Sequence, residues 1–197
     1  MEKPTEPAVD PEGAGAIYPL VARRLHWWAA ALVAVQLSVG LVMVRYGPAT
    51  HFAAPTGELY DGHKLLGLAI LLLVAVRLGY RLIRGAPPPE PSLARWQKAL
   101  SGLTHWAIYA MLLLVPLLGW LAISYYGAFR PFGLPMPTLA AANSALADRF
   151  FAFHRLAAYA LIVLVGMHIA AALFHYLVAK DGVMRRMLLR AGKRASP

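Results

Sequence analysis

The stretch FAFHRLAAYALIVLVGMHIAAALFHYLV, residues Phe151–Val178, is apolar apart from three histidines, two tyrosines and one arginine. It exceeds the roughly 20 helical residues that cross the hydrocarbon core of a bilayer. Three further apolar stretches can also cross a bilayer: Leu25–Arg45, His63–Leu82 and Leu103–Tyr125. Prolines and glycines interrupt the segments between them, and such residues end helices. The sequence therefore predicts an all-α membrane protein, a bundle of four transmembrane helices.

The composition agrees with a membrane protein and excludes several kinds of partner and cofactor. Of 197 residues, 59% are hydrophobic and 14% are charged, which suits one compact membrane unit. The net charge is +10, but the basic residues gather at the ends of apolar stretches, so no nucleic-acid partner is expected. Cysteine is absent, which excludes disulfides, iron–sulfur clusters and covalently attached c-type haem. Any redox cofactor must therefore be held without covalent links.

The basic residues also predict the orientation of the chain. Lys and Arg are most frequent before the first stretch, between the second and third, and after the fourth. Positive residues are kept preferentially in the cytoplasm, so the N and C termini are predicted to be cytoplasmic. Residues 1–17 lack the features of a signal peptide and are expected to form a disordered cytoplasmic tail. We expect residues 18–180 to form the transmembrane domain and 181–197 a basic cytoplasmic tail.

Histidines are the chemically informative residues. Six of the seven lie inside or at the edge of the apolar stretches, where ionisable side chains are costly and tend to be functional. His154 and His168 are fourteen residues apart, an interval that advances a helix by about 21 Å and returns to within about 40° of the same face. Each membrane face would then have one histidine on the same side of this helix, as two stacked haem sites require. A zinc pair on one helix would be three or four residues apart.

The same interval separates His26 from Gly40, His63 from Arg77, and His105 from Gly119. Because neighbouring helices run antiparallel, these residues and the pair on the last stretch form two levels. The cytoplasmic level contains His26, Arg77, His105 and His168, and the outer level contains Gly40, His63, Gly119 and His154.

The number of histidines differs between the two levels, so the sequence identifies the candidate haem ligands at one level but not at the other. The outer level has two histidines, the number that a six-coordinate b haem requires, whereas three compete at the cytoplasmic level. The glycines suit either a flat macrocycle or close helix packing. Arg77 suits either a haem propionate or a side chain that reaches the headgroups.

Several short segments resemble the prokaryotic cytochrome b561 family, including members described as superoxide oxidases. They are more distantly similar to the cytochrome b subunits of membrane formate dehydrogenases and hydrogenases. The resemblance extends from about Tyr18 to Met187. The matching segments are Arg24–Trp27, His63–Gly67, Val76–Leu78, Leu103–Tyr109, Phe132–Pro137, His154–Arg155, Lys180–Gly182 and Met184–Met187.

This resemblance implies two non-covalent b haems. The outer haem iron would be ligated by His63 and His154, and the cytoplasmic haem iron by His26 and His168. His105 would then contact a propionate or line a pocket. His175 would contact a ubiquinone headgroup or, alternatively, be an ordinary interfacial histidine.

The resemblance further implies a multi-pass protein of the bacterial inner membrane, in contact with lipid. We expect it to pass electrons from periplasmic superoxide to ubiquinone, with Arg45, Lys64, Arg130 and Arg149 attracting the anion. One alternative is a quinol-linked cytochrome b that exchanges electrons with a separate redox protein. A second alternative is a haem-free transporter or scaffold.

Overall fold

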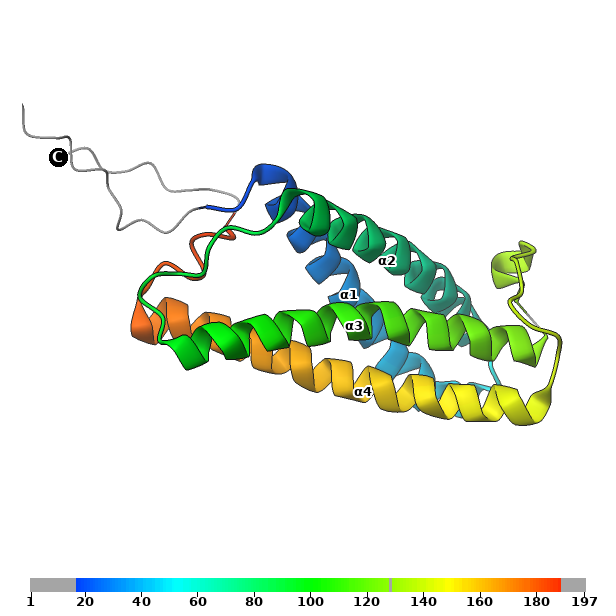
Figure 1. Cartoon of the computed structure of the whole chain (residues 1–197). Helices are drawn as coiled ribbons and strands as arrows, with labels where there is room; N and C mark the ends of the chain where they lie inside the picture. Colours follow the sequence, from blue (N-terminus) through cyan, green and yellow to red (C-terminus); the bar gives the residue numbers. More distant parts are fainter. Residues whose placement is uncertain (1–16, 128, 189–197) are drawn as a thin grey trace, which may run out of the picture.

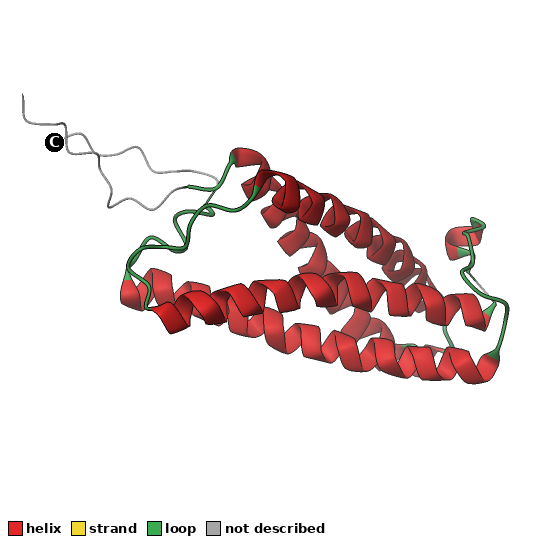
Figure 2. Cartoon of the chain, viewed as in Figure 1, coloured by secondary structure: helices red, strands yellow, loops and turns green. Residues whose placement is uncertain are grey.

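Four long helices make up most of the structure, a computed structural model that describes residues 17–127 and 129–188. They are α1 (Leu20–Tyr46), α2 (Thr56–Arg84), α3 (Arg95–Tyr126) and α4 (Ser144–Phe174), shown in Figure 1 and Figure 2. Each is long and apolar enough to cross a membrane, and the described part of the chain contains no β-strand. The predicted all-α bundle of four spans is confirmed. Most of both predicted tails, residues 1–16 and 189–197, lies outside the described residues.

The shorter elements lie at the ends of the long helices. Two 3₁₀ turns, η1 (Pro48–Thr50) and η2 (Pro131–Gly133), lie in the loops that precede α2 and α4. A π-helical turn, η3 (His175–Ala179), continues α4.

All four helices begin before the apolar stretches predicted for them. The first begins at Leu20 and the third at Arg95, because helical structure continues into the polar residues that flank an apolar segment. The fourth begins at Ser144, where the Asn143 side chain accepts a hydrogen bond of 3.1 Å from the Leu146 amide. This is the usual way to satisfy a free amide in the first turn of a helix.

The helices pack as two pairs. The closest backbone packing is between α3 and α4, followed by α1 with α2 and α2 with α3, whereas α1 and α4 do not approach comparably. The pairs diverge toward the end of the bundle that carries the loop 85–94 (Figure 1). Both described ends of the chain meet there, because the Tyr18 amide donates to the Arg186 carbonyl at 3.3 Å. The two described ends therefore share one side of the bundle, and the assignment of that side to the cytoplasm stays a prediction.

An apolar layer occupies the middle of the bundle. One residue from each helix lies midway along the fourteen-residue interval on that helix, and each is at most 7% exposed. These four residues, which we call the apolar layer, are Val33, Ile70, Leu112 and Leu161. Val74, Tyr109 and Val115 pack in the same cluster. The stripe that carries both histidine levels therefore faces the interior of the bundle.

Candidate functional site

The outer level brings together His63 of α2 and His154 of α4. Their ring centres are 6.1 Å apart, and the ring planes are inclined by 87°. Since a bond from a metal to an imidazole nitrogen measures about 2.0 Å, two imidazoles on opposite sides of one metal have ring centres about 6 Å apart. The spacing of this pair matches that requirement.

Helix α3 holds the ring of His154 in place. The Nδ1 atom of His154 lies 2.8 Å from the Val115 carbonyl, which can only accept, so Nδ1 donates and Nε2 remains available as a ligand. Gly119 permits this approach, because a Cβ atom at that position would lie 3.0 Å from Nδ1 and 3.1 Å from Cε1 of His154. Such distances are too short without movement of the ring.

Helix α1 lies against His63 in a similar way. A Cβ atom at Gly40 would lie 3.3 Å from Cε1 of His63, and the Gln36 amide group donates to the His63 carbonyl at 3.0 Å. The Nδ1 atom of His63 and the Oε1 atom of Gln36 are buried without a hydrogen-bond partner among the described residues. Because buried polar atoms normally have partners, these two mark unused binding capacity at the outer level.

The cytoplasmic level brings all three of its histidines together. The ring centres of His26 and His168 are 6.3 Å apart with planes inclined by 78°, whereas those of His105 and His168 are only 5.2 Å apart. The Nδ1 atom of His105 is bonded within its own helix, 2.6 Å from the Ser101 carbonyl. The distance expected for opposed ligands therefore favours His26 over His105 as the partner of His168.

Arg77 lies inside the bundle and contacts this cluster. Its Nη2 atom is 3.1 Å from Nδ1 of His26, and its guanidinium group lies 5.0 Å from the ring centre of Tyr109. Among residues 17–127 and 129–188, Arg77 forms no ion pair with a carboxylate. These contacts favour a position toward the cofactor site over the alternative of a side chain extended to the headgroups.

A cavity of about 970 Å³ opens around the cytoplasmic level. Its lining includes the three clustered histidines, Arg77 and His175. The volume is near the upper end of the range for ligand pockets, roughly 300–1,000 Å³. His51, by contrast, lies exposed in the loop after α1 and belongs to neither level.

Two acidic residues near this cavity escaped the sequence interpretation. Asp181 lies 2.5 Å from Nδ1 of His175, and Glu90 is 6% exposed in the proline-rich loop beside Arg186. Asp181 belongs to the segment Lys180–Gly182, which matched the family pattern but received no role. Residues six apart do not lie side by side in a regular helix, so the spacing of His175 and Asp181 does not predict their contact. The contact depends on the π-helical turn His175–Ala179.

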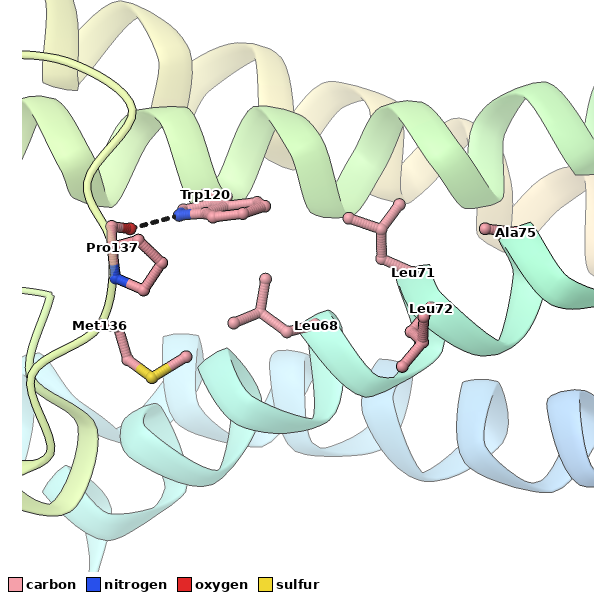
Figure 3. Close-up of a pocket in the computed structure, with 7 residues that line it drawn as sticks. All are labelled: Leu68, Leu71, Leu72, Ala75, Trp120, Met136 and Pro137. Atoms are coloured by element: carbon pink, nitrogen blue, oxygen red, sulfur yellow. Dashed lines mark hydrogen bonds between the residues drawn. The ribbon is translucent and has the colours of Figure 1, made fainter.

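A second hollow of about 360 Å³ lies between α2, α3 and the loop before α4 (Figure 3). It is lined by Leu68, Leu71, Leu72, Ala75, Trp120, Met136 and Pro137. The Trp120 indole N–H donates to the Pro137 carbonyl at 2.9 Å, as drawn in Figure 3. This lining is apolar apart from the indole N–H of Trp120 and contains no titratable side chain.

Comparison with known proteins gives independent evidence about the family. Residues 17–190 match the family model described as prokaryotic cytochrome b561. The chain is 36% identical over 128 residues to a probable superoxide oxidase CybB of Yersinia pestis, an alignment that covers 64% of this chain and 72% of that protein.

Two further relatives align over more of the chain. Cytochrome b561 homolog 2 of Escherichia coli is 30% identical over 180 residues, which is 87% of this chain and 90% of that protein. Cytochrome b562 of Cereibacter sphaeroides is 33% identical over 165 residues, which is 83% of this chain and 90% of that protein. With four spans and paired interior histidines, the chain belongs to the prokaryotic cytochrome b561 family, membrane electron-transfer proteins that carry haem b.

Proposed function

We propose that this protein holds one haem b at each histidine level and transfers electrons from periplasmic superoxide to ubiquinone across the bacterial inner membrane. The observation that carries the proposal is the spacing of two interior histidine pairs, 6.1 Å for His63–His154 and 6.3 Å for His26–His168. Each pair connects one helix of the α1–α2 pair with α4.

The residues at the outer level fit a haem. Val115 orients His154 so that Nε2 is the free ligand atom, and Gly40 and Gly119 keep the space beside both rings clear of side chains. The unpartnered Nδ1 atom of His63 is compatible with a ring whose other nitrogen binds metal.

The residues at the cytoplasmic level also fit a haem, and Arg77 adds an anion-binding group. A guanidinium group has no acceptor, so Nδ1 of His26 must accept the hydrogen bond from Arg77, and Nε2 carries the proton of the neutral ring. Metal binding at Nε2 would transfer that proton to Nδ1, and Arg77 would then need another acceptor. A haem propionate supplies one, which supports the assignment of Arg77 to the cofactor.

A b haem held by two imidazoles would supply one-electron transfer and would leave no position on the iron for dioxygen or peroxide. The overall reaction takes one electron from each of two superoxide anions, which leave as dioxygen. Ubiquinone takes up these two electrons with two protons and becomes ubiquinol. The chain orients the imidazoles and keeps the space between the levels dry with the apolar layer.

Superoxide as the donor is supported by the relative named probable superoxide oxidase. The predicted field of positive charge is weaker than four basic residues would suggest, because Lys64 is paired with Asp61 at 2.8 Å. Arg45, Arg130 and Arg149 remain as candidates to attract the anion. If they do, the rate falls as ionic strength rises, and a rate independent of salt contradicts this part of the proposal.

Ubiquinone is assigned to the end of the cytoplasmic cavity that His175 lines. His175 follows the proposed haem ligand His168 by seven residues, about two helical turns, so the haem would occupy the part of the cavity beside His26, Arg77 and His168. Reduction of quinone there would draw protons from the side of the bundle at which Tyr18 and Arg186 meet. We propose that this side is the cytoplasm, in keeping with its basic residues.

The deciding experiment mixes purified protein with superoxide and a ubiquinone analogue in a stopped-flow spectrometer. Wild-type protein should show b-type haem reduction followed by quinol formation. The H63A variant should lose superoxide-driven quinol formation, and the H51A variant, altered at an exposed loop histidine, should keep it. Full activity in H63A would refute the route through the outer level.

A second candidate is electron exchange with a separate redox protein. It is favoured by the two relatives that cover most of the chain and whose names do not mention superoxide. Under this alternative, the haems respond to a quinol and barely to superoxide in the same experiment. A preparation without any reducible b-type spectrum would favour the haem-free transporter instead.

A further inference from the structure

The end of α4 departs from regular helix at His175. Residues His175–Ala179 form a π-helical turn, and Lys180 follows in a left-handed conformation with φ of 52°. The amides of Lys180 and Asp181 both point to the His175 carbonyl. Such turns widen a helix locally and are frequent at functional sites. Here the turn brings Asp181 back against the side chain of His175.

The contact between these side chains is close and well supported. Oδ2 of Asp181 lies 2.5 Å from Nδ1 of His175, and Oδ1 accepts a hydrogen bond of 3.0 Å from the Val183 amide. Both side chains are largely buried, with 15% exposure for His175 and 13% for Asp181. The carboxylate is therefore held by the backbone on one side and bonded to the imidazole on the other.

The imidazole lies between the carboxylate and the cavity. His175 lines the cavity of the cytoplasmic level, but Asp181 does not. Since Nδ1 is bonded to Asp181, the other polar edge of the ring, with Nε2, is the one left for a ligand. Other charged groups also lie at this rim: Arg186 lies 3.9 Å from the Glu90 carboxylate and donates to the Pro88 carbonyl. Oε2 of Glu90 is buried without a hydrogen-bond partner among the described residues.

We propose that His175 donates protons to the quinone reduced in this cavity and that Asp181 is its positioning residue. This inference rests on the proposed function and names the source of protons that the reaction requires. Protonated His175 donates from Nε2 to a quinone oxygen as that oxygen gains electron density, and the ring regains a proton from cytoplasmic water. Two such transfers accompany the two electrons taken up by each quinone.

Asp181 contributes in two physical ways. Its carboxylate fixes the ring so that Nδ1 carries a proton, and it stabilises the positive charge of the protonated ring. A carboxylate beside a catalytic histidine has the same two effects in serine proteases, where the amide replacement leaves the fold intact and yields the wrong tautomer. General acid catalysis contributes roughly 10²–10⁴-fold in rate, so a mispositioned donor should be easy to detect.

The test compares D181N with D148N, the same substitution at an exposed position near the other end of α4. Full-length protein with haem is first reduced by limited dithionite and then mixed with a short-chain ubiquinone analogue. The rate of haem oxidation is followed in H₂O and in D₂O. This design supplies electrons without superoxide, so it does not depend on the identity of the physiological donor.

We expect D181N to oxidise at least about tenfold more slowly than wild type, with a larger solvent isotope effect. The D148N variant should stay within about twofold, a limit far below that contribution of a proton donor. The H175Q variant should be at least as slow as D181N, and exogenous imidazole should restore part of the rate in H175A. Nitrogen NMR of histidine-labelled protein supplies a readout independent of activity: Nδ1 of His175 should be protonated in wild type and mixed in D181N.

The outcomes separate the inference from the proposed function. If the analogue does not oxidise wild-type haem, both the quinone reaction and the inference are wrong. If wild type reacts and D181N reacts equally fast with an unchanged tautomer, only the inference is wrong. Loss of haem from D181N is recognised by its absorption spectrum, and H175Q then decides, because a fast H175Q variant rejects the proton-donor role alone.

Discussion

Replacement of Gly119 by alanine tests the outer site through a single methyl group. The new Cβ atom would lie 3.0 Å from Nδ1 of His154, the atom that donates to the Val115 carbonyl at 2.8 Å. The ring must move by a few tenths of an ångström, and the movement lengthens or breaks that hydrogen bond. The helix itself gains slightly, because alanine is favoured over glycine by about 1 kcal/mol inside a helix.

The size of the effect follows from the role of the hydrogen bond. Loss of a partner that orients a metal-ligating histidine typically lowers metal affinity about 10–100-fold, or roughly 1.4–2.7 kcal/mol. The G40A variant should lose less, because its Cβ atom would lie 3.3 Å from His63 and no hydrogen bond of that ring is at stake. The G166A variant is the matched control, because its Cβ atom would meet nothing within 4 Å.

The assay titrates haem into haem-depleted protein and follows the Soret absorbance, with thermal stability measured in parallel. We expect the haem affinity of the outer site to fall most in G119A and less in G40A, and to equal that of wild type in G166A. None of the three variants should lose thermal stability without haem. Equal haem affinity in G119A and G166A would refute the argument that Gly119 makes room for a ligand histidine.

Three other results are expected from the same geometry. In a haem stoichiometry assay, alanine at His63 or His154 should remove one haem per chain, and alanine at His26 or His168 should remove the other. The H105A variant should keep both haems, and loss of haem in H105A would contradict the choice of His26. The ring planes are inclined by 87° for His63–His154 and by 78° for His26–His168, which predicts strongly anisotropic low-spin haem signals in electron paramagnetic resonance. Signals typical of parallel imidazoles would rule out these ring orientations. Removal of the Arg77 charge in R77Q should lower the midpoint potential of one haem by about 50–100 mV, the order of one charge–charge interaction at an effective dielectric constant of about 20. R84Q at the exposed helix end is the control, and equal shifts in both variants would exclude a local effect.

The sequence predicted the parts of the structure that follow from helical periodicity. Four apolar stretches became four helices, and the stripe defined by His154 and His168 proved to face the interior, as the burial of Leu161 midway between them demonstrates. Periodicity alone could not choose between His26 and His105, because both lie on interior stripes at the same depth. The ring distances of 6.3 and 5.2 Å favour His26, and the choice between these two histidines stays a prediction.

Contacts that depend on backbone atoms or on irregular turns could not be predicted. The Val115 carbonyl that holds His154 has no sequence signature, because every residue carries a carbonyl. Asp181 reaches His175 only because a π-helical turn replaces the last turn of α4. The helices also extend beyond the predicted apolar stretches, since α3 begins at Arg95 and includes polar residues before Leu103 that hydropathy excludes.

The apolar layer has an electrical consequence. It separates the two histidine levels by about 21 Å, which is about two thirds of a hydrocarbon core of about 30 Å. An electron that passes inward between the levels therefore crosses most of the membrane dielectric, and this transfer is electrogenic. Moving one charge across the whole membrane costs about 2.3 kcal/mol per 100 mV. An inside-negative potential therefore opposes the inward transfer of each electron between the levels by about 1.6 kcal/mol per 100 mV. The membrane potential of the cell would thus disfavour the proposed reaction. For each 100 mV by which the potential falls, the equilibrium constant for electron transfer from the outer to the cytoplasmic level would rise more than tenfold.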